Sequence, residues 1–88
     1  MKFQIDFKQS VKKDLRKIES HFVEKIFVKI RELENFPDVA GLEKLSGFKD
    51  YFRMRIGDYR AVFRVFGKKY RIEICYIRHR KFVYKSLS

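Results

Sequence analysis

The chain has 88 residues, the length of one domain with one core, and its 10 Phe and 5 Tyr supply the bulk for packing that core. One cysteine, Cys75, excludes an intramolecular disulfide, and together with two histidines it is too few for a zinc site. No apolar run approaches the roughly 20 residues of a membrane span, and the N-terminus lacks the apolar stretch of a signal peptide. The composition therefore predicts one domain over residues 1–88, located in the cytoplasm, with no metal or cofactor and no membrane partner.

The formal net charge is +11, and it is unevenly spread along the chain. Residues 1–44 hold 10 Lys and Arg against 8 Asp and Glu, whereas residues 45–88 hold 12 against 3. Such an excess of one sign indicates a polyanionic partner, either a nucleic acid or an acidic protein. An anionic membrane surface fits less well, because no predicted helix combines a cationic face with a strongly apolar one. Nucleic acid is therefore the leading class of partner.

The N-terminal half predicts a strand followed by a helical hairpin. Residues 2–7 alternate between apolar and polar side chains, which is typical of a strand. From Ser10 onward the apolar residues recur at helical spacing. Ser20 is the predicted N-cap of a second helix, and Pro37 marks the region where that helix ends.

Residues 38–50 read as a connection, and the segment after them predicts a hairpin. Gly57 and Asp58 suit a type II′ turn, which pairs Arg55 with Arg60 across the two strands. The alternation then sends one set of side chains to the core: Phe52, Met54, Ile56, Tyr59, Ala61, Phe63 and Val65. The other set carries the positive charge: Arg53, Arg55, Arg60 and Arg64. Like charges opposite each other are destabilising, so this pattern indicates a surface for an anionic ligand.

The last strand tests this arrangement. A two-residue turn at Gly67 and Lys68 would place Glu73 among the arginines and Cys75 on the same side as a small filler. Four residues would then face the core: Tyr70, Ile72, Ile74 and Tyr76. A three-residue turn would bury Arg71 and Glu73 without partners, which desolvation disfavours. The predicted fold class is therefore α+β, a small mainly antiparallel sheet in the order β-α-α-β-β-β with the helical hairpin on one face.

Several stretches together resemble the RelE-like toxins of the RelE/ParE superfamily, from type II toxin–antitoxin pairs. They are the opening strand followed by "SVKKDLRKI", the connection "LEKLSG", the hairpin "YFRMRIGDYRAVF" and the ending "YIRHRKFVYKSL". The resemblance implies a metal-independent endoribonuclease that cuts mRNA, in the ribosomal A site. In such a cleavage the RNA 2′-hydroxyl attacks the adjacent phosphate and leaves a 2′,3′-cyclic phosphate. The implied partners are mRNA, the ribosome and an acidic antitoxin that neutralises the toxin.

The resemblance also implies site residues, position by position. The catalytic set is Arg53, Arg55, Arg60, His79, Arg80 and Tyr84. The RNA-binding set is Arg64, Arg78 and Lys81. In the family pattern, the arginine after the hairpin turn grips the scissile phosphate and the C-terminal aromatic stacks on the nucleotide, which is worth about 1–3 kcal/mol per base.

Two points about this site depend on residue chemistry and on strand parity. Arginine keeps its proton, so a general base would be His79 or Tyr84 rather than Arg53 or Arg55. Arg78 and Arg80 share the parity of Tyr76, which is predicted to face the core. A bulge or the strand's end near Ile77 must therefore turn these two arginines toward the site.

Other interpretations of the same residues stay open. A ParE-like poison of DNA gyrase would act through protein–protein contacts, and the ending "HRKFVY" favours the ribonuclease over it. A non-catalytic RNA-binding relative would use the same phosphate-binding residues. The arginines could also form a solvated sheet face, His79 could be an ordinary surface histidine, and Tyr84 could anchor the C-terminus by packing.

Overall fold

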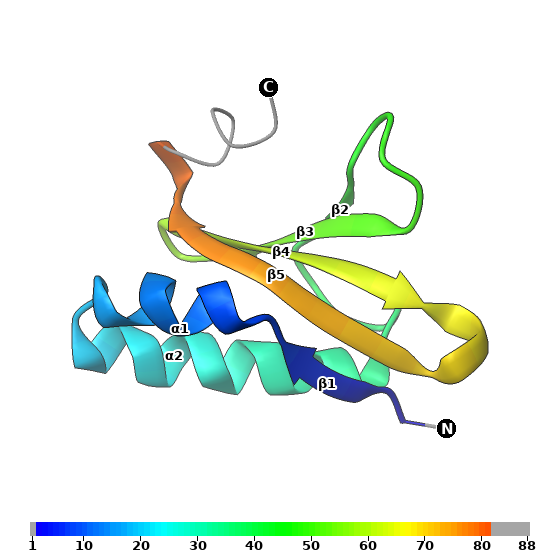
Figure 1. Cartoon of the computed structure of the whole chain (residues 1–88), viewed down its shortest axis with the longest axis horizontal. Helices are drawn as coiled ribbons and strands as arrows, with labels where there is room; N and C mark the ends of the chain where they lie inside the picture. Colours follow the sequence, from blue (N-terminus) through cyan, green and yellow to red (C-terminus); the bar gives the residue numbers. More distant parts are fainter. Residues whose placement is uncertain (1, 82–88) are drawn as a thin grey trace.

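The structure, a computed structural model, describes residues 2–81 and combines one mixed sheet with two helices (Figure 1). The strands are β1 (Gln4–Phe7), β2 (Leu42–Lys44), β3 (Tyr51–Ile56), β4 (Tyr59–Phe66) and β5 (Arg71–His79), in the sheet order β1-β5-β4-β3-β2. The helices α1 (Gln9–Arg16) and α2 (Ser20–Arg31) lie on one side of this sheet. Strand β1 runs parallel to β5, and the other neighbouring pairs are antiparallel. The predicted α+β fold is therefore confirmed.

The predicted cap of the second helix is wrong by one position. Ser20 is the first residue of α2, while Glu19 occupies the cap position in an extended conformation. The Glu19 carbonyl oxygen accepts hydrogen bonds from the N–H groups three and four residues later, at 3.0 and 3.1 Å. The helix ends at Arg31 and continues as a 3-10 helix over Glu32–Asn35, which stops just before the predicted boundary at Pro37. Packing of the apolar stripe rather than a serine hydroxyl therefore defines where α2 starts.

The core fills the space between the helices and the sheet. Its buried residues are Val11, Ile26, Ile30, Leu33, Met54, Ala61, Phe63, Val65, Ile72, Ile74 and Ile77. Phe63 stacks on Phe52 at a ring separation of 5.8 Å, and Phe36 packs edge-on against both rings. No helix within residues 2–81 is long and apolar enough to cross a membrane.

The predicted hairpin of β3 and β4 is confirmed in its register. Ile56 pairs with Tyr59 and Arg55 pairs with Arg60, as the turn at residues 57 and 58 requires. Gly57 has φ of 58°, and Asp58 has no positive φ, which fits a type II′ turn rather than type I′. The alternate residues of both strands therefore reach the core, and the arginines between them face away from the helices.

The segment over residues 38–50, predicted as a connection, contains the short strand β2. This strand has three residues, and Glu43 at its centre pairs with Arg53 of β3. Three residues are too few for an alternation to stand out from a loop, and the strand forms because β3 offers it a partner. The sheet consequently has one strand more than the predicted order.

The predicted two-residue turn between the last two strands is wrong. Phe66 pairs with Arg71, so the connection has four residues: a 3-10 turn over Gly67–Lys69, then Tyr70 in a left-handed conformation. Tyr70 therefore lies outside the strand and is exposed, although its ring contacts Phe3 at 5.5 Å. Turns of two and of four residues give the same alternation along β5. Ile72 and Ile74 therefore face the core and Glu73 faces the other side, as predicted.

A β-bulge in β5 changes which side chains face the core. Phe63 pairs with Ile74 but Val62 pairs with Tyr76, so Cys75 is an extra residue without a partner across the ladder. Beyond the bulge Ile77 is buried in the core, and Tyr76 lies on the opposite face, contrary to its predicted core position. The same shift carries Arg78 to the face of the hairpin arginines.

The bulge residue Cys75 is a filler of the kind that the sequence predicts. Its side chain is buried, and this burial raises the pKa of its thiol. A raised pKa leaves less reactive thiolate at a given pH. We expect the thiol reagent DTNB to label Cys75 at least about tenfold more slowly in the folded protein than in the unfolded protein at pH 8. Absorbance of the released thiolate measures the labelling rate. Equal rates in the folded and the unfolded protein would contradict the buried position of Cys75.

Candidate nucleic-acid interface

Three arginines form a row across the outer face of the sheet, the face opposite the helices. Arg55 of β3 pairs with Arg60 of β4, and Arg60 pairs with Arg78 of β5. We call these three residues the arginine row. Neighbouring strands lie about 4.8 Å apart, so the row spans roughly 10 Å. Because cations directly opposite each other are destabilising, this arrangement is typical of a site that receives a polyanion.

The next row contains an ion pair and an aromatic ring. Arg53 is only 8% exposed, and its Nη2 lies 2.7 Å from Oε1 of Glu43 on the edge strand β2. This hydrogen bond and the charge of Arg53 hold the pKa of the Glu43 carboxyl below its ordinary value, with further lowering by Arg55 and Arg60. At the other end of the row, the Tyr76 ring lies 4.9 Å from the guanidinium carbon of Arg78.

The two rows enclose a small pocket, which we call the basic pocket. Its volume is about 180 Å³, and its lining residues are Gly41, Leu42, Glu43, Arg53, Arg55 and Arg60. A drug-sized ligand needs roughly 300 Å³ or more, so this volume suits a single anionic group such as a phosphate. Glu43 is the one carboxylate among the lining residues, and sequence reasoning missed it because its strand was read as a loop.

Arg60 is held in place by the backbone of its own hairpin. Its Nη1 donates hydrogen bonds to the carbonyl oxygens of Gly57 (2.8 Å) and Tyr59 (2.9 Å). Both bonds come from one nitrogen of the guanidinium, and the donors on Nε and Nη2 can contact a phosphate. Fixing the side chain before a ligand arrives reduces the entropy that binding costs.

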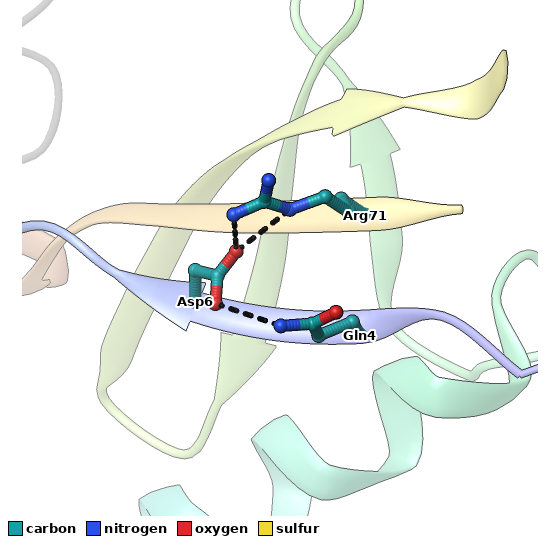
Figure 2. A network of polar contacts seen from close by, with 3 residues as sticks. All are labelled: Gln4, Asp6 and Arg71. Carbon is teal, nitrogen blue, oxygen red and sulfur yellow. Dashed lines mark hydrogen bonds and ion pairs between the residues drawn. The ribbon is translucent and has the colours of Figure 1, made fainter. Parts of the chain in front are cut away.

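The other half of the outer face is balanced in charge. Figure 2 shows Arg71 of β5 reaching across to Asp6 of β1, with Nε and Nη2 both directed at Oδ2 and the Nε distance 3.0 Å. Gln4 donates to the second oxygen of the same carboxylate at 3.5 Å. This network compensates the charge of Arg71 within the protein. The excess positive charge of the face is therefore concentrated at its hairpin end.

Arg64, predicted to bind RNA, belongs to the balanced half. It pairs with Glu73 in the ladder, and its guanidinium carbon lies 4.6 Å from the Phe66 ring and 5.7 Å from the Tyr51 ring. Arg64 lies four positions along β4 from Arg60, a distance of roughly 13 Å. The structure thus places Arg64 on the predicted face but away from the basic pocket.

The remaining predicted site residues lie elsewhere. His79 pairs with Tyr59, and the two rings meet edge to face at 5.6 Å on the helix side of the sheet. Arg80 follows the end of β5, where its N–H donates to the Asp58 carbonyl oxygen at 2.8 Å and its Nε lies 4.0 Å from the Asp58 carboxylate. Lys81 is exposed beside it. Tyr84 lies outside the described residues, so its role stays a prediction.

The structure therefore brings Arg53, Arg55, Arg60 and Arg78 to one face of the sheet, and it places the ring of His79 beside Tyr59 on the opposite face. The sequence predicts that a bulge or the strand's end near Ile77 turns Arg78 toward the site. A bulge does turn Arg78 to this face, and the extra residue is Cys75. In the sequence, the bulge is visible only as a spacing of three residues between the core residues Ile74 and Ile77, where a regular strand would have a spacing of two.

Comparison with known proteins shows the family to which this chain belongs. A family model described as the ParE toxin of the type II toxin–antitoxin system parDE matches residues 5–84. The chain is 30% identical over 82 residues to toxin RelE3 of Methanocaldococcus jannaschii, covering 89% of this chain and 91% of that protein. The fold and these matches define a toxin of a type II toxin–antitoxin system. The chain belongs to the ParE toxin family and is a RelE-like toxin within it.

Solved structures support the same conclusion. In the crystal structure of the RelB–RelE antitoxin–toxin complex from Methanococcus jannaschii, a chain superimposes with a TM-score of 0.77 at 27% identity, covering 94% of this chain and 99% of that one. A chain of the archaeal RelE–RelB complex from Pyrococcus horikoshii gives 0.73 at 26%, with coverages of 91% and 97%. A free RelE mutant from E. coli gives 0.80 at 22% identity, with coverages of 99% and 93%, which shows the shared fold.

Proposed function

We propose that this toxin is a metal-independent endoribonuclease that cuts mRNA in the ribosomal A site in the cytoplasm. The observation that carries the proposal is the arginine row beside the basic pocket. Arg55, Arg60 and Arg78 stand in one line across three strands. A line of guanidinium groups can hold consecutive phosphates and stabilise the charge that develops on the one being cleaved.

The proposed reaction needs few protein groups. The RNA 2′-oxygen attacks the adjacent phosphorus, the bond to the 5′-oxygen breaks, and the products are a 2′,3′-cyclic phosphate and a 5′-hydroxyl. The 2′-hydroxyl loses a proton, and the leaving 5′-oxygen gains one from solvent. Arg55 and Arg60 neutralise the additional negative charge on the non-bridging phosphate oxygens. Holding the 2′-oxygen, the phosphorus and the leaving 5′-oxygen in line accounts for much of the rate enhancement.

Glu43 is the proposed acceptor of the 2′-hydroxyl proton. It lines the basic pocket together with three arginines, which cannot lose a proton. Its carboxyl is ionised at neutral pH, as an ordinary glutamate is, and Arg53 lowers its pKa further, which makes it a weaker base, so its position in the pocket rather than its pKa favours this role. Of the two predicted bases, His79 pairs with Tyr59 and lies on the other side of the sheet, and Tyr84 lies outside the described residues.

The partner that controls this activity is, in our proposal, a cognate antitoxin. Two of the relatives with similar structures were solved as complexes of toxin and antitoxin. The net charge of +11 favours an acidic antitoxin that covers or displaces part of the basic surface.

The test is cleavage of a defined message on translating ribosomes, with a second arm on free RNA in EDTA. We expect primer extension to map new 5′-hydroxyl ends of the message within A-site codons. We also expect that cleavage requires no added metal ion. The match to the ParE family model makes gyrase poisoning the second candidate. Unaffected translation together with trapped gyrase–DNA cleavage complexes would overturn the ribonuclease proposal in favour of that candidate.

A further inference from the structure

A larger pocket lies on the helix side of the sheet, beyond the edge of the arginine row. We call it the helix-side pocket; its volume is about 690 Å³, within the range of ligand-binding pockets. Three cations contribute to its lining: Lys17 after α1, Arg78 at the end of β5, and Lys81. The lining has one carboxylate, Asp14, whose Oδ2 already accepts a hydrogen bond from the Ile77 N–H at 3.1 Å. The rim of this pocket is therefore net positive.

Apolar and aromatic groups line the same pocket. Ile18 and Ile77 contribute aliphatic surface, and the rings of Tyr59 and His79 stand edge to face at 5.6 Å. The Tyr59 ring also contacts Phe22 at 5.9 Å, so the aromatic surface continues toward α2. Aromatic rings beside cations form the combination on which proteins stack unpaired nucleobases while they hold the backbone.

The helix-side pocket is continuous with the proposed cleavage site through one residue. Arg78 stands in the arginine row opposite Arg60, and it also lines this pocket. A strand whose phosphates follow the row can therefore pass around the end of β5 into the pocket without leaving the positive surface. This continuity favours RNA as the occupant over an unrelated small molecule.

We propose that the helix-side pocket binds an unstacked nucleotide of the same RNA strand, next to the nucleotides held on the arginine row. Tyr59 and His79 contact its base, and Lys17 and Lys81 contact its phosphates. The inference rests on the proposed ribonuclease function and gives His79 a role in substrate binding rather than in proton transfer. The base is recognised by stacking, so the pocket accepts any of the four bases.

The experiment measures RNA binding by fluorescence anisotropy with 2′-O-methyl RNA, which lacks the attacking hydroxyl. One probe has three nucleotides, enough for the arginine row, and the other has ten. We expect the double variant Lys17→Ala/His79→Ala to lose about tenfold in affinity for the longer probe and little for the shorter one. Lys12→Ala, an equal charge change on α1 at a position outside the pocket lining, is the matched control.

A second measurement does not depend on any variant. Ten-nucleotide RNA with 5-iodouridine at single positions is cross-linked to the wild-type protein by light, and the modified residue is found by mass spectrometry. We expect one nucleotide position to attach to Tyr59 or His79. Thermal melting of the double variant, followed by circular dichroism, shows whether the variant is folded.

The possible outcomes separate the two proposals. If the wild-type protein binds neither probe and cuts no message, the ribonuclease function itself fails. If it binds and cuts, but the double variant binds the longer probe like wild type and no cross-link reaches Tyr59 or His79, the pocket assignment is overturned. A double variant that binds RNA normally but loses affinity for the antitoxin would assign this pocket to the protein partner instead.

Discussion

Arg60→Ala is expected to reduce cleavage of the message about 10²–10³-fold at saturating RNA. This is the usual effect of removing one fixed donor from the charge that develops in a transition state. Arg60 is held by two backbone carbonyls at 2.8 and 2.9 Å, so its truncation removes a guanidinium that is fixed before RNA binds. Arg60→Lys should recover only a small part of the loss, because an ammonium group lacks the planar fork. Single-turnover rates on a programmed ribosome measure both variants.

Arg71→Ala is the matched control for this prediction. Arg71 lies on the same outer face and carries the same charge, but Asp6 compensates it within the charge-balanced half. An exposed pair of this kind contributes at most about 1 kcal/mol to stability. The control should therefore cut RNA like wild type, and equal losses in both variants would show that total charge, rather than the arginine row, carries the activity.

Glu43→Gln is expected to change RNA binding and cleavage in opposite directions. Removing the negative charge leaves the charge of the Arg53 guanidinium, whose Nη2 lies 2.7 Å from Oε1 of Glu43, less neutralised, so the basic pocket attracts a phosphate more strongly. Affinity for uncleavable RNA should therefore rise several-fold. The rate of cleavage should fall about 10²-fold or more, because the amide cannot accept a proton. Anisotropy with 2′-O-methyl RNA and single-turnover kinetics measure the two effects separately.

The pH dependence of cleavage checks the same assignment. The ordinary pKa of this carboxyl is 4.5, and Arg53 lowers it in the folded protein. A base with a lowered pKa stays ionised as the pH falls from neutrality, and it loses its accepting form only below its ordinary value. The cleavage rate should consequently be flat between pH 5 and pH 7. A decline centred near pH 6.5 would point to a histidine base and contradict the role of Glu43.

Most of the fold could be predicted because the hairpin determines its own register. Gly57 and Asp58 specify the turn, and the alternation on both sides of it separates the arginines from the core residues. Strand β2 could not be predicted, because three residues carry no measurable period and the strand depends on pairing with β3. Because this strand was not predicted, neither the position of Glu43 nor its ion pair with Arg53 could be predicted.

The candidate site could be predicted only in part for a related reason. Arg53, Arg55 and Arg60 follow from the turn, whereas the position of Arg78 depends on a bulge that sequence periodicity alone does not locate. His79 was assigned from its chemistry and its resemblance to relatives. Its side of the sheet is set by the ladder with Tyr59, which the predicted register of β5 did not include.

Because of the bulge at Cys75, the number of residues in β5 determines which of its side chains face the core. Upstream of it the even-numbered residues Ile72 and Ile74 point inward, and downstream of it the odd-numbered Ile77 does. Deleting one residue here would leave the net charge unchanged, yet it would exchange the inward and outward sets beyond it. Arg78 would then turn under the helices at a large cost in desolvation. Any relative that keeps an arginine at this place in the row must therefore keep the extra residue too, and a gap in an alignment at this point would mark a toxin with a different surface.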